Sequence, residues 1–282
     1  MRDELISETK ESEAMQLYRP LKIAVLIPAY NEEKNIETVL EEIQKLRTMR
    51  PRWNILPIVV NDGSKDRTEQ VLGRIAPQYG AYAIHLPLNL GIGRAVQTGF
   101  KYAVRWGADV ALQLDGDGQH PPDQIPAIVD PVLQRKADVV VGSRYVTGAG
   151  GNVSSLFRQA GTMFFSVLLK LLVGVEIKDT TSGYRAFNRD AIEYLSRCYP
   201  DDYPEVEAYV LLARKRFTML EVPVRMRHRM RGSSSITPLK SAYYMIKVAF
   251  SAAIGMIRPL PDREITVTGV IGGLDSLESK VG

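Results

Sequence analysis

Short apolar segments alternate with helical patterns along the first half of the chain, and this alternation limits the fold more than any other feature. Five segments are typical of buried strands, at residues 23–28, 56–60, 81–86, 110–114 and 138–142. The first intervening helix is expected to begin at Asn31, with apolar residues at helical spacing at Ile36, Val39, Leu40, Ile43 and Leu46. Strands that alternate with helices predict an α/β fold with a mixed, mostly parallel sheet covered on both faces.

Polar loops follow four of these strands, at residues 29–32, 61–64, 115–120 and 143–145. In open α/β sheets, ligands bind outside the carboxyl ends of the strands. The coincidence of polar loops with strand ends therefore predicts a single crevice, surrounded by Glu32, Asp62, Asp115, Asp117 and Arg144.

The acidic turn at residues 115–119 is a candidate metal site. Residues two apart on a strand share a face, so Asp115 and Asp117 converge if the strand continues or bends gently between them. Gln119 lies two residues further on, and its amide oxygen completes a ligand set suited to Mg²⁺ or Mn²⁺. These ions usually keep positions open for water and a substrate diphosphate. The alternative is a surface turn, because Asp-Gly is common turn chemistry.

The glycine loop at residues 89–95 precedes a predicted helix. It lacks the dinucleotide-binding fingerprint, because the third glycine of that motif would fall at Val96, and it lacks the Gly-Lys-Ser/Thr of a P-loop. Gly91 and Gly93 still allow a diphosphate to approach the backbone at a helix start, with a plain strand-to-helix turn as the alternative. Asp62 is suited to accept hydrogen bonds from a base or ribose, or else belongs to a helix-capping loop.

Arginines alternate with other residues at residues 225–231, after a strand expected over residues 217–226. If this segment is extended, its four arginines share one face, and phosphates or anionic lipid headgroups are suitable partners. The alternative is a solvated edge strand. Residues 232–235 are Gly-Ser-Ser-Ser, which would let the segment move as a lid over a diphosphate.

Composition narrows the function classes. The chain has 282 residues, 45% of them hydrophobic, which suits one large domain with additions. A formal net charge of +4 favours phosphate-bearing partners or an anionic membrane, and nucleic acid is not an expected partner. The single cysteine, Cys198, excludes an internal disulfide and a multi-cysteine metal site. The histidines lack metal-ligand spacing and are expected to be non-ligands: His85, His120 and His228.

The pattern at residues 1–13 is polar and acidic, unlike a signal peptide, and no stretch reaches the roughly 20 apolar residues of a membrane span. A cytoplasmic location is therefore expected. The helix expected at residues 238–257 combines cationic and aromatic groups, which suits a membrane-surface helix or a dimer face, with core packing as the alternative.

In this order, the motifs resemble those of family 2 glycosyltransferases of the GT-A fold, and most of all the dolichyl- or polyprenyl-phosphate sugar transferase branch. The resemblance covers residues 20–240. It rests on residues 27–32 (IPAYNE), 60–64 (VNDGS), 89–95 (NLGIGRA), 114–122 (LDGDGQHPP), 142–145 (GSRY), 179–185 (DTTSGYR) and 231–236 (RGSSSI).

The resemblance implies a role for each matching residue. The nucleotide's base and ribose would be lined by Pro28, Ala29, Tyr30, Glu32 and Asp62, with Gly91 and Gly93 at the diphosphate. Asp115, Asp117 and Gln119 would hold Mg²⁺ or Mn²⁺. The acceptor phosphate or donor diphosphate would be contacted by Arg144, Arg229 and Arg231, and the catalytic residues would be Asp117, Arg144 and Arg231.

The implied function is metal-dependent, inverting transfer of a hexose from a UDP- or GDP-hexose to a polyprenyl phosphate, at the inner face of the membrane. One alternative is the same fold acting on a saccharide or soluble hydroxyl, for which Glu205 or Glu207 would be the general base or, if not, helix N-terminal charges. Another alternative is a non-catalytic protein that binds a nucleotide sugar.

Many members of that branch carry C-terminal transmembrane helices, whereas none is expected in this chain. It would reach the lipid peripherally or through a membrane-protein partner, and a homo-oligomer stays open. The expected organisation is a polar leader (1–20), a nucleotide-sugar and metal-binding half (21–145), an acceptor half (146–237), an amphipathic helix (238–260) and a tail (261–282).

The alternating arginines lead to a first prediction. Arg231→Ala should lower acceptor-dependent turnover by about 10²-fold or more, the scale of losing one transition-state contact. Steady-state kinetics with the wild type and the variant measure the effect. Unchanged kinetics would remove Arg231 from the site.

Overall fold

The computed structural model describes residues 19–147, 156–201, 204–227 and 238–261. Its strands are β1 (Leu21–Ala29), β2 (Trp53–Asn61), β3 (Tyr82–His85), β4 (Val110–Gln113), β5 (Val139–Ser143), β6 (Arg185–Asn188) and β7 (Met219–Pro223). Its helices are α2 (Ile36–Met49), α3 (Thr68–Ile75), α4 (Ile92–Trp106), the 3₁₀ turn η1 (Pro122–Gln124), α5 (Ile125–Leu133), α6 (Leu156–Val173), α7 (Arg189–Cys198), α8 (Pro204–Arg214) and α9 (Pro238–Ile257).

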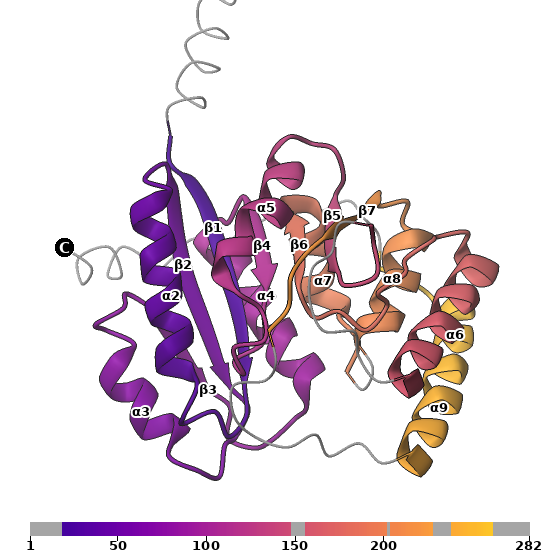
Figure 1. Cartoon of the computed structure of the whole chain (residues 1–282), viewed down its shortest axis with the longest axis horizontal. Coiled ribbons are helices and arrows are strands. Elements are labelled where there is room, and N and C mark those ends of the chain that lie inside the picture. The colour runs from indigo at the N-terminus through magenta and orange to yellow at the C-terminus, as the bar shows by residue number, and fades with distance from the viewer. Residues whose placement is uncertain (1–18, 148–155, 202–203, 228–237, 262–282) are drawn as a thin grey trace, which may run out of the picture.

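Within the described residues, the strands form one sheet in the order β3-β2-β1-β4-β6-β5-β7 (Figure 1). Every pair is parallel except those of β6, which runs antiparallel to both β4 and β5. The predicted mixed, mostly parallel α/β sheet is therefore confirmed. For four of the five expected strands, both the first and the last residue lie within two residues of the observed bounds.

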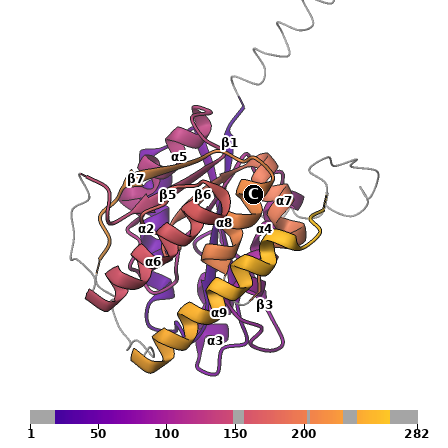
Figure 2. The same cartoon turned by 90° about the vertical axis from the view of Figure 1, so that its right-hand side faces the viewer.

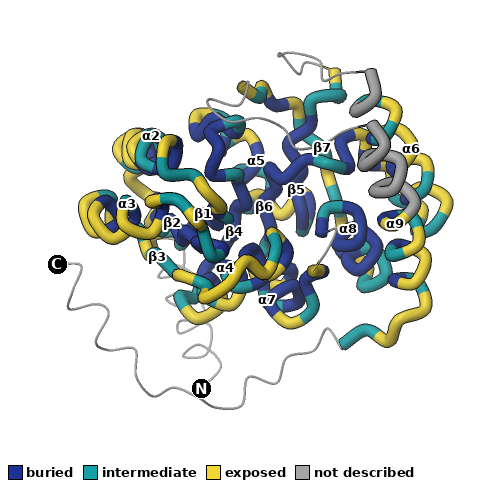
Figure 3. Tube along the Cα trace, turned by 90° about the horizontal axis from the view of Figure 1, so that it is seen from below, coloured by how far each residue is buried: buried dark blue, intermediate teal, exposed yellow. Residues whose placement is uncertain are grey.

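Helices cover both faces of the sheet, as the burial of β1 requires. Alternate residues of this strand enter different cores: Ala24 and Leu26 pack in one, and Ile23, Val25 and Ile27 in the other. The first core lies beneath α4, α7 and α8, and the second beneath α2, α3 and α5. Figure 3 shows the buried tube concentrated in the central strands, with exposed segments on the outer helices.

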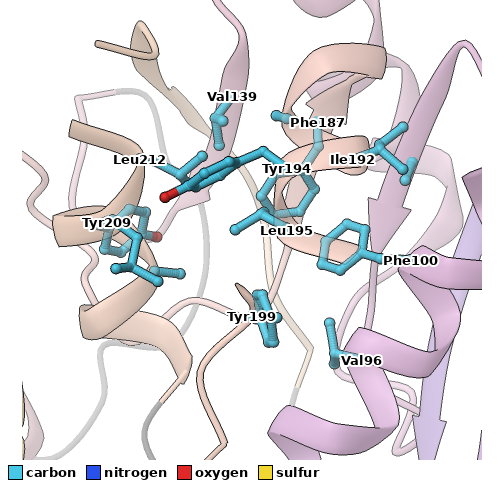
Figure 4. Packing of buried hydrophobic residues seen from close by; sticks show 14 of the residues in the cluster. Val96, Phe100, Val139, Phe187, Ile192, Tyr194, Leu195, Tyr199, Tyr209 and Leu212 are labelled. Carbon is cyan, nitrogen blue, oxygen red and sulfur yellow. The ribbon is translucent and has the colours of Figure 1, made fainter. Parts of the chain in front are cut away.

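Aromatic rings join the helices of the first core (Figure 4). Phe100 of α4 meets Phe187 of β6 edge to face, with ring centroids 5.1 Å apart, and meets Tyr199 at 5.3 Å. Tyr194 of α7 packs against Phe217 at 5.7 Å. Each such pair contributes about 0.5–1.5 kcal/mol beyond the burial of its area. This cluster fixes α4 and α7 against the sheet.

Helices α6 and α9 pack against α8 and against each other (Figure 2), and their inner residues, such as Leu169 and Val248, belong to the first core. The bounds of α9 match the helix expected at residues 238–257. No helix in the described part of the chain is both long and apolar enough to cross a bilayer.

Two local predictions were wrong for identifiable reasons. Helix α2 begins at Ile36 rather than Asn31, because Asn31 adopts a left-handed conformation with φ of 58° and its side-chain oxygen accepts backbone hydrogen bonds from Lys65 and Asp66. Strand β7 spans Met219–Pro223 rather than the expected residues 217–226, because its neighbour β5 begins at Val139, which pairs with Met219, and ends at Ser143, which pairs with Pro223. Strand β6 was missed, because its four residues followed a polar loop without an apolar run.

A glycine at the start of α4 tests the packing. A Cβ at Gly93 would overlap the carbonyl oxygens of Pro200 and Asp201, so Gly93→Ala should lower the free energy of unfolding by about 2 kcal/mol or more. The matched control is Gly73→Ala in α3, where a Cβ meets nothing within 4 Å and alanine should add about 0.5–1 kcal/mol. Urea unfolding measures both. Equal effects of the two substitutions would contradict the close approach.

Candidate active site

A pocket of about 1160 Å³ opens at the carboxyl ends of β1, β2 and β4. Eight residues expected at the site line it: Pro28, Ala29, Tyr30, Glu32, Asp62, Gly91, Asp115 and Asp117. Gly93, Gln119 and Arg144 lie outside this lining. Arg229 and Arg231 fall outside the described residues. The structure thus brings together side chains from three separate loops, at the edge where α/β sheets bind ligands.

The loop after β1 is locked to the loop after β2. The backbone N–H of Asn31 donates to the Ser64 hydroxyl at 2.9 Å, and that of Glu32 donates to the Thr68 hydroxyl at 2.9 Å. Asn35 also donates to the Glu32 carboxylate at 2.6 Å. These bonds hold one wall of the pocket in place before a ligand arrives, which reduces the ordering cost of binding.

Asp62 connects the second loop to the glycine loop. Its buried carboxylate accepts hydrogen bonds from the backbone N–H groups of Leu90, at 2.8 Å, and Gly91, at 2.9 Å. Gly63 allows this contact, because it has φ of +61° and a Cβ there would lie 2.5 Å from the carbonyl carbon of Leu88. Asp62 therefore positions the loop that precedes α4, and its predicted contact with a base or ribose stays a prediction.

The two glycines of that loop have different surroundings. Gly91 has φ of +90° and lines the pocket just before the N-terminus of α4. At Gly93, the space for a side chain is filled by the backbone of residues 200–201, and Arg94 forms an ion pair with Asp201 at 2.6 Å. The absence of a side chain at Gly93 is thus explained by packing of the protein itself, whereas Gly91 stands where a diphosphate can approach a helix N-terminus.

The acidic pair lies in a turn after β4, with both residues lining the pocket. Asp117 is buried, and one of its carboxylate oxygens accepts the backbone N–H of Gln119 at 3.0 Å. Asp115 is half-exposed and lies against Gly183, where a Cβ would be 3.1 Å from its carboxylate. The strand itself ends at Gln113, so the pair converges through the turn rather than through an extended strand.

The donor set suits a hard divalent cation, since Mg²⁺ and Mn²⁺ prefer oxygen ligands. Two carboxylates on one pocket wall match ions that bind through one or two carboxylates and complete their coordination with water and substrate phosphates. No group of three or more His, Cys, Asp or Glu side chains suited to a metal ion occurs among the residues described. The pair therefore fits a cation that is bound together with a diphosphate better than one held by protein ligands alone.

His120 holds the acidic turn through a hydrogen bond to its backbone. Its Nδ1 accepts the backbone N–H of Asp115 at 2.9 Å, which fixes the remaining proton of a neutral ring on Nε2. The ring is stacked on Tyr184, with centroids 4.8 Å apart and an interplanar angle of 8°, and the Tyr184 hydroxyl donates to the Pro121 carbonyl at 2.9 Å. His120 was expected to be a non-ligand, and its contacts indicate a positioning role.

Arg144 is held by a buried carboxylate. Its guanidinium forms a bidentate pair with Asp179, at 2.8 and 2.7 Å, and its backbone N–H donates to the same carboxylate at 3.0 Å. Burial alone would lower the pKa of Arg144, but the hydrogen bonds and the charge of Asp179 outweigh burial and raise it. The charge of Asp115 acts in the same direction, which places Arg144 within electrostatic range of the acidic pair.

A second arginine, Arg185, is fully buried beneath the acidic turn. It donates to the Gln113 side-chain oxygen at 3.0 Å and to the Tyr199 hydroxyl at 2.7 Å. Its guanidinium also lies over the rings of Phe187 and Tyr209. Burial would lower the pKa of Arg185, but nearby tyrosine hydroxyls and Glu205 outweigh it and raise that pKa.

The two glutamates considered as general bases have different surroundings. Glu207 accepts a hydrogen bond from the Ser251 hydroxyl at 2.8 Å, so it lies between α8 and α9. Glu205 faces Arg185, and burial raises its pKa while the charge of Arg185 opposes that change. The charge of Asp115 also acts on Glu205. Glu205 is therefore within electrostatic range of the acidic turn.

Sequence reasoning missed the supporting residues His120, Asp179, Tyr184 and Arg185 as parts of the site. The signal available was their presence in two of the quoted motifs, residues 114–122 and 179–185, which the fold brings together. Nothing in the spacing alone shows that the second motif packs against the first, because the contact depends on the antiparallel pairing of β6 with β4.

Comparisons with known proteins agree with this geometry. The model of the family described as "Glycosyl transferase family 2" matches residues 24–195. A UDP-N-acetylglucosamine–dolichyl-phosphate N-acetylglucosaminyltransferase from Methanococcus voltae is 33% identical over 218 residues, covering 72% of this chain and 84% of the relative. A polyprenol monophosphomannose synthase from Mycolicibacterium smegmatis is 29% identical over 230 residues, covering 80% of this chain and 84% of the relative.

A solved structure supports the fold. A mannosyltransferase from Pyrobaculum calidifontis, in complex with GDP-Man and Mn²⁺, aligns with a TM-score of 0.53 at 17% identity. The alignment covers 84% of this chain and 74% of that structure. At this identity, the likeness concerns the arrangement of strands and helices.

The role of His120 can be tested through metal affinity. His120→Phe keeps a ring on Tyr184 but removes the acceptor for the Asp115 N–H, so the affinity for Mn²⁺ in the presence of UDP or GDP should fall about tenfold or more. His120→Asn, which restores an acceptor, should recover part of the loss. Titration of Mn²⁺ followed by electron paramagnetic resonance measures both. Wild-type affinity in the phenylalanine variant would exclude this role.

Proposed function

Because the chain belongs to glycosyl transferase family 2, we propose that this enzyme transfers a hexose from a UDP- or GDP-hexose to a polyprenyl phosphate, with a divalent cation and with inversion at the anomeric carbon. The observation that carries the proposal is the pocket in which Asp115 and Asp117 face the loops of Asp62 and Gly91. The names of the relatives from Methanococcus voltae and Mycolicibacterium smegmatis support the lipid-phosphate acceptor.

The nucleotide would occupy the part of the pocket between the loops after β1 and β2, lined by Pro28, Ala29, Tyr30, Glu32 and Asp62. Hydrogen bonds between these loops keep that part preformed. The diphosphate would lie toward Gly91, where the N-terminus of α4 offers backbone N–H groups and a favourable dipole.

Asp115 and Asp117 would hold the cation against this diphosphate, with Gln119 next to them in the same turn. When bound, Mg²⁺ or Mn²⁺ neutralises charge that develops on the departing diphosphate. The protein's contribution is to hold this turn: the Asp117 carboxylate accepts the backbone N–H of Gln119, and the backbone N–H of Asp115 donates to Nδ1 of His120.

The acceptor phosphate would approach from the side of Arg144, whose guanidinium is fixed by Asp179. An oxygen of this phosphate forms a bond to the anomeric carbon while the bond from that carbon to the diphosphate breaks, in line and with inversion. The attacking oxygen is already anionic, so no proton has to be removed and no strong general base is needed. We keep Arg229 and Arg231 in this proposal as further phosphate contacts.

A lipid acceptor implies catalysis at a membrane surface, and we propose that the protein is a peripheral protein at the inner face of the membrane. A homo-oligomer or a membrane-protein partner is compatible with this assignment.

One observation favours a second candidate function, transfer to a saccharide hydroxyl. Glu205 is within electrostatic range of the acidic turn, and burial raises its pKa, as suits a general base for a neutral hydroxyl. A non-catalytic nucleotide-sugar-binding protein is disfavoured by family membership and by the fixed acidic pair.

A turnover screen tests the proposal. With UDP- and GDP-hexoses and Mn²⁺, a polyprenyl phosphate should yield a chloroform-extractable sugar product, EDTA should abolish its formation, and Mn²⁺ or Mg²⁺ should restore it. Asp117→Asn should lower turnover about 10²-fold or more, since it weakens stabilisation of the transition state. The matched control is Asp123→Asn, an exposed carboxylate nearby.

Full turnover in EDTA would refute the metal dependence. Nucleotide release with a water-soluble saccharide, but without a lipid product, would favour the second candidate, and Glu205→Gln should then abolish that release.

A further inference from the structure

Helix α6 has a core face and an apolar exposed face. Phe165 and Leu169 are buried in the first core. On the other side, Met163, Val167 and Leu171 are 70%, 51% and 78% exposed. Their spacing of four residues places them in one row along the helix. Burial in the core therefore does not explain why this row is apolar.

Helix α9 repeats this arrangement. Val248 and Ala252 are buried against the rest of the protein, whereas Phe250, Ile254 and Ile257 are 68%, 45% and 81% exposed. The exposed residues are again three or four positions apart, and they form a second row.

The two rows belong to neighbouring helices. Helices α6 and α9 contact each other and both contact α8, and they lie side by side on the outside of the molecule (Figure 2). The six exposed residues Met163, Val167, Leu171, Phe250, Ile254 and Ile257 are named here the α6–α9 face. Several large apolar side chains gathered on one side of a protein mark a surface that binds another apolar partner.

Charge distinguishes between the partners. The sequences of α6 and α9 contain four basic residues and no acidic residue. In a symmetric dimer through this face, α6 and α9 of one copy would meet the same two helices of the other copy, whose charged residues are all basic, so their charges would repel. An anionic lipid surface instead offers apolar chains for the exposed rows and negative headgroups for the basic residues. Lys247 of α9 is exposed and can reach a negative headgroup.

The face adjoins the acceptor side of the pocket. Thr162, next to Met163 in the chain, accepts through its carbonyl oxygen a hydrogen bond from the Thr180 hydroxyl at 3.4 Å. Thr180 follows Asp179, the residue that holds Arg144. A membrane in contact with α6 would therefore lie a few side chains away from the arginine expected at the acceptor phosphate.

We propose that the α6–α9 face docks on a membrane surface that contains anionic lipids, so that α6 and α9 act together rather than α9 alone. The inference deepens the proposed function, on which it rests for the choice of a lipid-phosphate acceptor. It assigns the peripheral attachment to six named residues and orients the acceptor side of the pocket toward the bilayer.

Vesicle binding of the full chain tests the docking. The wild type should co-sediment with phosphatidylcholine vesicles that contain phosphatidylglycerol, and less with phosphatidylcholine alone. The double variant Leu171→Ser/Ile257→Ser should reduce the partition coefficient about tenfold or more, because each side chain loses the gain from leaving water. The control Met49→Ser removes a side chain that is 62% exposed on α2 and should bind like the wild type.

Turnover separates docking from catalysis. With a short, water-soluble prenyl phosphate and no vesicles, the double variant should match the wild type, whereas with a long-chain acceptor in vesicles it should fall. Wild type that stays in the supernatant, or variant and control that bind alike, would overturn the docking surface.

A dimer that the double variant dissociates in sedimentation velocity, without any vesicle binding, would also overturn it in favour of a second copy. Vesicle binding that depends on Leu171 and Ile257, together with no transfer to any prenyl phosphate, would support the surface and refute the proposed function.

Discussion

The antiparallel pairing of β6 with β4 is the interaction on which the site depends. It places residues 179–185 beside the acidic turn, in a register that pairs Arg185 with Gln113. From this position Gly183 lies against Asp115, Tyr184 stacks on His120, and Asp179 holds Arg144. A strand of four residues thus supports both the acidic turn and the arginine expected at the acceptor.

Two kinds of restraint act on the pocket. In the loops after β1, β2 and β3, backbone N–H groups donate to Ser64, Thr68 and Asp62, so these loops hold one another. Beside the acidic turn, Asp179 pairs with the guanidinium of Arg144. Arg185 donates from one nitrogen to a glutamine and to a tyrosine hydroxyl and lies over aromatic rings, while its Nε and Nη1 have no hydrogen-bond partner. Buried charges without such partners would be very costly, so these contacts also favour one arrangement of the loops.

The sequence predicted the parallel part of the sheet well, because the strands that form it are continuous apolar runs and Asp115 follows one of them directly. The clustering of Asp62, Gly91 and Asp117 followed from their places after strands. The start of α2 was not predictable, since the left-handed Asn31 depends on bonds to residues 65 and 66. Nor was the partner of Arg144, because Asp179 reaches it through a strand pairing that leaves no periodic signal in four residues.

The same pairing sets a limit for protein engineering. Residues 21–145 supply the loops that line the pocket, including the acidic turn, yet their strand β4 borders β6, which the chain forms only at Arg185–Asn188. A fragment that ended near residue 145 would leave one side of β4 without its neighbour and expose an apolar strand edge, a known template for aggregation. Chimeras that exchange residues 21–145 between relatives therefore need to carry residues 179–188 with them.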